Sequence, residues 1–275
     1  MADLVKIENY EGTANTFTFP YNPQSYQETA TTFNQSTQVP YSNFHVFIGN
    51  DALQPKRINF SGNFATSTKD SDYESITRNL QEGSKLKKLY FRDDRFHIVL
   101  GTSFQKTHSN NRTNFLDYVF DALTPIPLAF SSTQKTASYN GSTWDDNTTS
   151  NDGGTYTYLE EVTFTLDASA SSGDTFTLSS SNDSGITITL TDNYTSGEVF
   201  TIKMVRYEKT AGLYQTKYWQ CKDSSGNQQS RAKASGKDEL ALRLEKDEQV
   251  DSYSFSGDIS YSDVTFKFRD GYNGG

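Results

Sequence analysis

Apolar and polar residues alternate in short runs along the first half of the chain, and turn-forming residues separate these runs. Side chains of a β-strand point alternately to opposite faces, so this alternation predicts half-buried antiparallel strands. The runs lie at 16–19, 44–48, 57–62, 88–92, 96–100 and 114–121. Asp93 and Asp94 stand between the fourth and fifth runs as a tight turn, which predicts a hairpin over 88–100.

One segment of this half has a helical period instead. Ser71 followed by Glu74 fits a capping box, and Tyr73, Ile76 and Leu80 repeat at the spacing of one helix face. Gly83 stands where a glycine commonly ends a helix. The sequence therefore predicts one helix over about 72–82. Its apolar stripe is narrow, so we expect it to pack on a sheet.

The composition changes between Ser131 and Gly154 to serine, threonine, asparagine, aspartate and glycine, which predicts a linker or a long surface loop. Alternating runs then resume at 162–166, 186–190, 200–204, 240–244 and 264–268. Short strands at this spacing, with polar turns between them, are typical of a β-sandwich. We predict an all-β, mainly antiparallel protein with two β-sandwich domains. Residues 1–130 form the first, which carries the short helix, and residues 155–275 form the second.

Composition and charge narrow the class of protein. Aromatic residues make up 14% of the 275 residues, which favours pleated sheets. The net charge of −9 disfavours a protein that binds the phosphates of nucleic acid electrostatically. No apolar run approaches the ~20 residues of a membrane helix, and Met1–Lys6 lacks the apolar core of an export signal. The single cysteine, Cys221, excludes an internal disulfide framework.

The sequence shows no catalytic, cofactor or metal motif. His45, His97 and His108 have no second histidine at a metal-ligand spacing, and Cys221 has no nearby thiol or imidazole partner. There is no glycine-rich phosphate loop and no nucleophile elbow. We therefore predict a protein that is not an enzyme and that needs no cofactor.

Two acidic features leave minor alternatives open. Glu160 and Glu161 could suggest a glycosidase, but neighbours on a strand point to opposite faces, which favours a solvated pair. The oxygen-rich loop around Asp145, Asp146 and Asp152 could attract calcium, but its spacing matches no calcium loop. A plain polar loop is the favoured interpretation.

Trp144 and Trp219 are the two tryptophans of the chain. If exposed, they could stack on sugar rings, as in a carbohydrate-binding β-sandwich module. Large aromatic side chains are more often buried, so packing in the core is the favoured interpretation of Trp219. Glycan contact through these two residues stays open as an alternative.

The order of these features resembles the distal tail (Dit) family of long-tailed bacteriophages. The likeness rests on Ile58–Phe64 as a strand before a helix, Tyr73–Gly83 as that helix, Leu86–Leu100 as the hairpin, Leu116–Phe120 before Pro125, and Asp263–Tyr272 as the last strand. It spans most of the chain. The polar stretch from Tyr21 to Val39 is longer than the family pattern, so the strands before Val39 stay unassigned.

The resemblance implies a structural protein of the virion, assembled in the host cytoplasm. Six copies would form a hub ring that joins the tail tube to the tail tip or baseplate and lets DNA pass. Its partners would be the tail tube protein, the tail hub or tip protein and receptor-binding proteins. We hypothesise that Arg57–Phe64 and Leu89–Leu100 form the collar sheet, with a ring interface at Ile58, Phe60, Leu89, Phe91, Ile98 and Leu100. A tail tube or terminator protein is the nearer alternative, although such proteins usually have one domain.

Overall fold

The computed structural model divides the chain into two compact units, an N-terminal unit (Met1–Ala129) and a C-terminal unit (Phe130–Asn273). It describes residues 5–10, 16–30, 34–38, 45–49, 55–65, 67–82, 86–107, 114–139, 155–180, 186–210, 213–229, 245–247 and 253–272. Antiparallel strands dominate these residues, with one helix among them. The predicted fold class, all-β with a single short helix in the first half, is confirmed.

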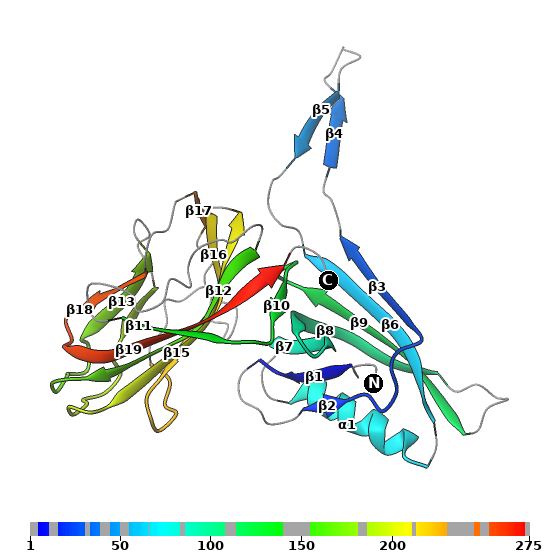
Figure 1. Ribbon diagram of the computed structural model, residues 1–275, viewed down its shortest axis with the longest axis horizontal. Coiled ribbons are helices and arrows are strands. Elements are labelled where there is room, and N and C mark those ends of the chain that lie inside the picture. The colour runs from blue at the N-terminus through cyan, green and yellow to red at the C-terminus, as the bar shows by residue number, and fades with distance from the viewer. Residues whose placement is uncertain are drawn as a thin grey trace. The chain divides into compact units, whose positions relative to one another are not determined.

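The N-terminal unit is an antiparallel sheet folded over its own core (Figure 1). Its elements are β1 (Lys6–Asn9), β2 (Phe17–Thr18), β3 (Ser25–Ala30), β4 (Asn34–Gln38), β5 (His45–Gly49), β6 (Lys56–Ala65), α1 (Lys69–Gln81), β7 (Leu86–Arg92), β8 (Arg95–Thr107) and β9 (Phe115–Thr124). The long strand β8 pairs with β7 through its first half and with β9 through its second half. The pairing order is β2-β1-β7-β8-β9-β6-β3, so β2 and β3 are edge strands of this path. Strands β4 and β5 pair with each other as a separate hairpin.

Aromatic rings fill the space inside this folded sheet. Phe19, which follows β2, lies 5.4 Å from the Phe60 ring of β6 and 5.4 Å from the Tyr118 ring of β9, between ring centroids. All three side chains are buried. Glycine is required at position 62 because a Cβ there would stand 2.6 Å from the Tyr118 hydroxyl. The aromatic core therefore depends on a glycine in the partner strand.

Helix α1 begins earlier than the prediction, at Lys69, and ends at Gln81, within one residue of the predicted end. Thr68 is its N-cap residue, and Ser71 lies in the first turn, where its hydroxyl donates to the Thr68 carbonyl at 2.8 Å. The predicted capping box at Ser71 and Glu74 is therefore wrong: a second residue suited to capping stands three positions earlier. The predicted contact face is confirmed, because Ile76 is buried and Tyr73 stacks on Phe104. Gly83 lies outside the described residues.

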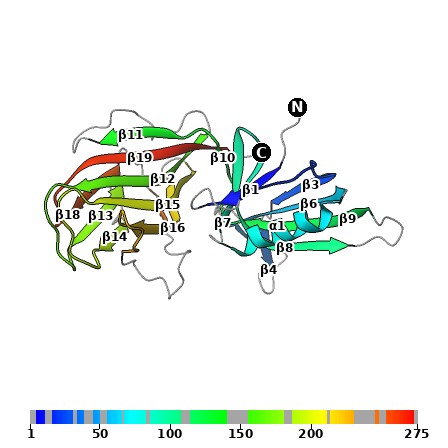
Figure 2. The same ribbon diagram turned by 90° about the horizontal axis from the view of Figure 1, so that it is seen from below.

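The C-terminal unit packs a large sheet against a three-stranded sheet. Its elements after β10 (Ala129–Ser131) are β11 (Lys135–Tyr139), β12 (Thr155–Leu166), β13 (Thr175–Ser180), β14 (Ile186–Thr189), β15 (Val199–Thr210), β16 (Leu213–Lys222), β17 (Glu245–Asp247), β18 (Tyr253–Gly257) and β19 (Tyr261–Tyr272). The large sheet has the order β17-β16-β15-β12-β19, and β12, β15 and β19 lie side by side in Figure 2. The smaller sheet has the order β14-β13-β18.

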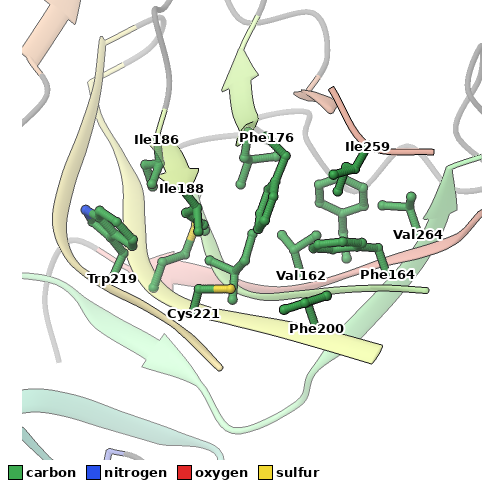
Figure 3. Packing of buried hydrophobic residues seen from close by; sticks show 14 of the residues in the cluster. Val162, Phe164, Phe176, Ile186, Ile188, Phe200, Trp219, Cys221, Ile259 and Val264 are labelled. Atoms are coloured by element: carbon green, nitrogen blue, oxygen red, sulfur yellow. The ribbon is translucent and has the colours of Figure 1, made fainter. Parts of the chain in front are cut away.

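The side chains between these two sheets form one apolar cluster (Figure 3). Phe164 and Phe200 stack at 5.3 Å in its centre, and Phe176 of the smaller sheet meets Phe164 edge-on at 4.9 Å. Alternation along β12 and β15 places these residues on the inner face, as the sequence pattern indicates.

Part of the segment predicted as a linker is a strand. Residues 135–139 form β11, which pairs with β19 from Lys135↔Phe268 to Tyr139↔Val264. Short polar strands of this kind lack the apolar alternation on which the prediction depended. The strand predicted at 240–244 lies outside the described residues. Within the described part of the chain, no helix is both long enough and apolar enough to cross a membrane.

Candidate functional site

A cavity of about 360 Å³ opens in the N-terminal unit, beside edge strand β3 and the β7–β8 turn. Its walls combine apolar, aromatic and charged groups, from Val5, Asn22, Pro23, Tyr26, Glu28, Phe91, Arg92, Arg95, His97 and Ala129. This size and mixture of side chains is typical of ligand-binding and recognition sites.

Strand β3 brings two of these side chains to the cavity. It pairs with β6 from Ser25↔Ser61 to Ala30↔Lys56, and among the described strands it has no neighbour on its other side. Because successive side chains alternate, Tyr26 and Glu28 share one face of β3. Both line the cavity.

Glu28 is held as a carboxylate between the His97 imidazole on one side and the Lys56 ammonium on the other. The Nε2 atom of His97 lies 3.2 Å from Glu28 Oε1, and the Nζ atom of Lys56 lies 3.7 Å from Oε2. The hydrogen bond from His97 is the main cause that lowers the pKa of Glu28 to about 2, against the opposing effect of burial. Glu28 is therefore ionised at neutral pH.

Tyr26 closes one side of the cavity with an aromatic ring. Its hydroxyl donates to Glu28 Oε1, and its ring centroid lies 3.9 Å from that of Phe91. Partial burial, followed by the hydrogen bond to Glu28, raises the pKa of Tyr26 above its ordinary value. The phenol stays neutral, and its side chain keeps 39% exposure.

Two arginines stand at the β7–β8 turn. The pairing of β7 with β8 shifts register between Tyr90 and Arg92, and such a bulge re-aims the side chains around it. Arg95 Nε lies 3.5 Å from Asp94 Oδ2. The exposed Arg92 forms no ion pair with any residue that the structure describes.

The chemistry of this cavity suits binding better than catalysis. Its carboxylate has a lowered pKa, whereas a general acid needs a raised one. Its hydroxyl belongs to a neutral phenol bonded to that carboxylate. Among the described residues, no group of three or more His, Cys, Asp or Glu side chains could hold a metal ion.

The side chains predicted to form the ring interface lie largely in the interior. Ile58, Phe60, Leu89 and Ile98 are fully buried, whereas Phe91 and Leu100 are partly exposed. Their strands also have neighbours on both sides: β6 lies between β3 and β9, and β7 lies between β1 and β8. The four buried side chains cannot contact a second copy, which corrects the prediction for them. Alternating apolar residues in a half-buried sheet point to the core of their own unit.

The two tryptophans proposed for glycan contact have separate outcomes. Trp219 is fully buried in the apolar cluster of the C-terminal unit (Figure 3), so the core interpretation holds and a role as an exposed sugar platform is excluded. Trp144 lies outside the described residues. Cys221 is buried in the same cluster, and burial raises the pKa of its thiol.

Glu160 and Glu161 differ from the predicted solvated pair. A register shift between Leu159 and Glu161 makes a bulge. Arg269 Nε donates to Glu160 at 2.7 Å, and Lys267 binds Glu161. Because Arg269 and Lys267 are two positions apart on β19, both carboxylates meet the same face of that strand. Each has its own cation, which favours a structural role.

Sequence reasoning missed the cavity because it missed β3. The run Ser25–Thr29 contains one large apolar residue, Tyr26, and therefore lacks the alternation that marks a half-buried strand. The only available signal was one aromatic residue, Tyr26, within this polar run. His97 was expected to be packed in a strand, and it is buried there.

No family model and no curated protein matches the sequence. Among solved structures, the chain is similar to the Dit protein (gp 19.1) of phage SPP1, described as a paradigm of the hub adsorption apparatus in phages that infect Gram-positive bacteria. Identity is 10% and the TM-score 0.41, over 98% of this chain and 100% of that one.

The chain is also similar to a protein in the phage P2 baseplate in its activated conformation. The structure with calcium gives 13% identity and a TM-score of 0.43, over 98% of both chains. The structure with strontium gives 10% identity and a TM-score of 0.43, over 97% of both chains. The SPP1 protein bears the name of the family that the sequence resembles. At these identities and TM-scores, neither structure assigns a role to any residue of this chain.

Proposed function

We propose that this protein is a structural component of a bacteriophage tail, a distal tail protein whose copies form a ring-shaped hub at the tail tip. The observation that carries the proposal is the arrangement of the segments on which the sequence resemblance rests. They are consecutive elements of the N-terminal unit: β6, α1, the β7–β8 hairpin, and β9 before Pro125. A second all-β unit ending in β19 follows them, in the order that the family pattern implies.

The proposal includes a hexamer, because the resemblance implies six copies. A closed ring needs a contact between two different surfaces of each copy. The open side of edge strand β3 offers one such surface, because an unpaired strand edge can accept a neighbouring chain. The ring interface is thus proposed at β3, in place of the buried side chains of β6, β7 and β8.

The charge distribution refines the proposal that DNA passes through the ring. Residues 1–129 contain 12 basic and 13 acidic residues, a net charge of −1, whereas residues 130–275 contain 13 and 21, a net charge of −8. If the N-terminal units form the collar, electrostatic repulsion between the protein and DNA contributes little to DNA passage there. Passage would depend instead on a surface with no net attraction for phosphate.

The test is negative-stain electron microscopy and native mass spectrometry of the purified full-length protein. We expect rings with a central hole and a mass of six chains. A protein that stays monomeric at high concentration in both measurements contradicts the proposal. The proposed partners, the tail tube protein and the tail hub or tip protein, should then co-purify with the ring and not with a monomeric variant.

A further inference from the structure

We infer that the cavity beside β3 is the docking site for an extended acidic segment of a second copy of this chain. The inference rests on the proposed function, because it names the contact that would close the ring. It joins three separate features of the described residues: an open strand edge, an exposed aromatic wall and an arginine without an acidic partner.

The strand edge provides the first feature. Among the described strands, β3 pairs only with β6, and its residues Ser25–Ala30 include neither proline nor lysine, two residues that commonly protect an edge from pairing. Its single charge, Glu28, lines the cavity and is paired there with His97 and Lys56. The backbone of β3 is therefore open to one further strand.

The aromatic wall provides the second feature. Tyr26 lines the cavity and keeps 39% of its surface exposed, and Tyr21, with 48% exposed, directly precedes the lining residues Asn22 and Pro23 in the chain. Exposed tyrosines next to a preformed cavity are typical of the residues that dominate binding energy in protein interfaces. The hydrogen bond from Tyr26 to Glu28 fixes the orientation of its ring before a partner arrives.

Charge decides the occupant. Arg92 is exposed at the cavity and has no ion-pair partner among the described residues, so it attracts a carboxylate. The chain itself has 34 acidic residues against 25 basic ones, and 21 of the acidic residues lie in residues 130–275. A second copy therefore supplies the complementary charge, whereas a basic partner does not fit this end of the site.

The test compares Arg92→Glu with Arg78→Glu in the full-length protein. Arg78 is an exposed arginine of α1 whose only described ion pair, to Glu82, spans 3.8 Å, so both variants make the same charge change at exposed positions. We expect Arg92→Glu to raise the dissociation constant of self-association at least about tenfold and Arg78→Glu to change it less than about twofold. Sedimentation velocity measures both, and circular dichroism verifies that each variant is folded.

Photo-cross-linking supplies a second readout that does not depend on a charge change. A benzophenone amino acid at position 26 should form cross-links between chains, with an acidic peptide of this same protein as the product found by mass spectrometry. Cross-links within one chain only, or rings of Arg92→Glu as stable as those of the unmodified protein, would overturn the inference and leave the proposed hub function standing. A protein that forms no ring at all would overturn both.

Discussion

The two units bury aromatic residues between strands in the same way, and both bury charged side chains, but only the N-terminal unit has a described cavity beside them. In the N-terminal unit, charged groups enter the interior: Lys87 is buried beside the helix, and Glu28 meets His97 next to the cavity. In the C-terminal unit, the buried pair of Arg269 and Glu160 lies outside the apolar cluster around Phe164 and Trp219, and an excess of acidic residues gives the unit a net charge of −8.

This difference shows that the groups that stabilise a unit are not always groups that can bind a partner. An ion pair that is closed between strands contributes to the stability of its unit but presents no recognition chemistry to a partner. Buried charges cost free energy unless they are paired, so a unit that keeps them gains specific geometry. The described cavity lies in the N-terminal unit, where the paired Glu28 and His97 line it. Similar aromatic packing therefore does not predict similar roles.

The largest expected effect comes from removing one core ring in each unit. Phe60→Ala should destabilise the N-terminal unit, and Phe164→Ala the C-terminal unit, by about 4 kcal/mol each, because both rings are fully buried. Both tryptophans lie in residues 130–275, so tryptophan fluorescence during urea unfolding follows only the C-terminal unit. Phe164→Ala should shift this transition and Phe60→Ala should not. Equal shifts in both variants would mean that the two units unfold together.

The next effect concerns the buried ion pair of the C-terminal unit. Arg269 binds Glu160 and the carbonyls of Ser131 and Ser132, so Arg269→Ala leaves a buried carboxylate without its cation. We expect a loss of about 3 kcal/mol in the tryptophan-monitored transition. Lys267→Ala, which removes a partly exposed lysine from Glu161, is the control, with a loss below about 1 kcal/mol. Similar losses in both would show that burial of the pair contributes little.

A smaller effect is expected at the helix of the N-terminal unit. The Lys87 ammonium donates to the carbonyls of Asn79 at 2.6 Å and Glu82 at 2.7 Å, at the C-terminal end of α1. Lys87→Ala should cost about 2–3 kcal/mol, because it leaves buried carbonyls unsatisfied and removes a cation from the negative end of the helix dipole.

Circular dichroism should detect this loss, while tryptophan fluorescence should stay unchanged. Lys106→Ala, which removes an exposed lysine 4.6 Å from the Tyr73 ring, is the control and should cost less than about 1 kcal/mol. If Lys87→Ala leaves the free energy of unfolding unchanged, water replaces the ammonium at these carbonyls.

The smallest effect depends on pH. The pKa of Glu28 is about 2 in the folded protein against an ordinary value of 4.5, so its stabilisation is complete above pH 4.5 and is lost as the pH falls toward 2. Glu28→Gln should lower the free energy of unfolding by about 2 kcal/mol at pH 6. It should also show a weaker pH dependence between pH 4.5 and 2 than the unmodified protein.

Urea titrations monitored by circular dichroism across this range measure both quantities. Glu74→Gln, at an exposed position of α1, serves as the matched control and should follow the unmodified protein. If Glu28→Gln keeps the full pH dependence, the hydrogen bond from His97 does not stabilise the unit.

The strands with apolar alternation could be predicted from the sequence, and the polar edge strands could not. The run 57–62 falls within β6, and 264–268 falls within β19, because each has one face in an apolar core. Strand β3 forms from Ser25–Ala30 through backbone pairing with β6, and β11 forms through pairing with β19. Those hydrogen bonds depend on a partner distant in sequence, and side-chain pattern does not show them.

The same limit applies to the candidate site. Glu28 and His97 are 69 positions apart, and no spacing rule connects them. Their contact exists because β3 and the β7–β8 hairpin meet across the fold of the sheet. The bulge that places Glu160 and Glu161 on one face of β19 likewise appears only once strands are paired.

The sequence by itself determined the all-β class, the position of the helix and the burial of the alternating aromatic residues, because each follows from the local period of side chains along a strand or helix. Only the tertiary structure decided which strand has a free edge, where a cavity opens and which charges meet, because these depend on pairing between distant segments. For this protein, the local period of side chains determines which residues form the two cores. Long-range strand pairing determines the surface that is proposed to join one copy to the next.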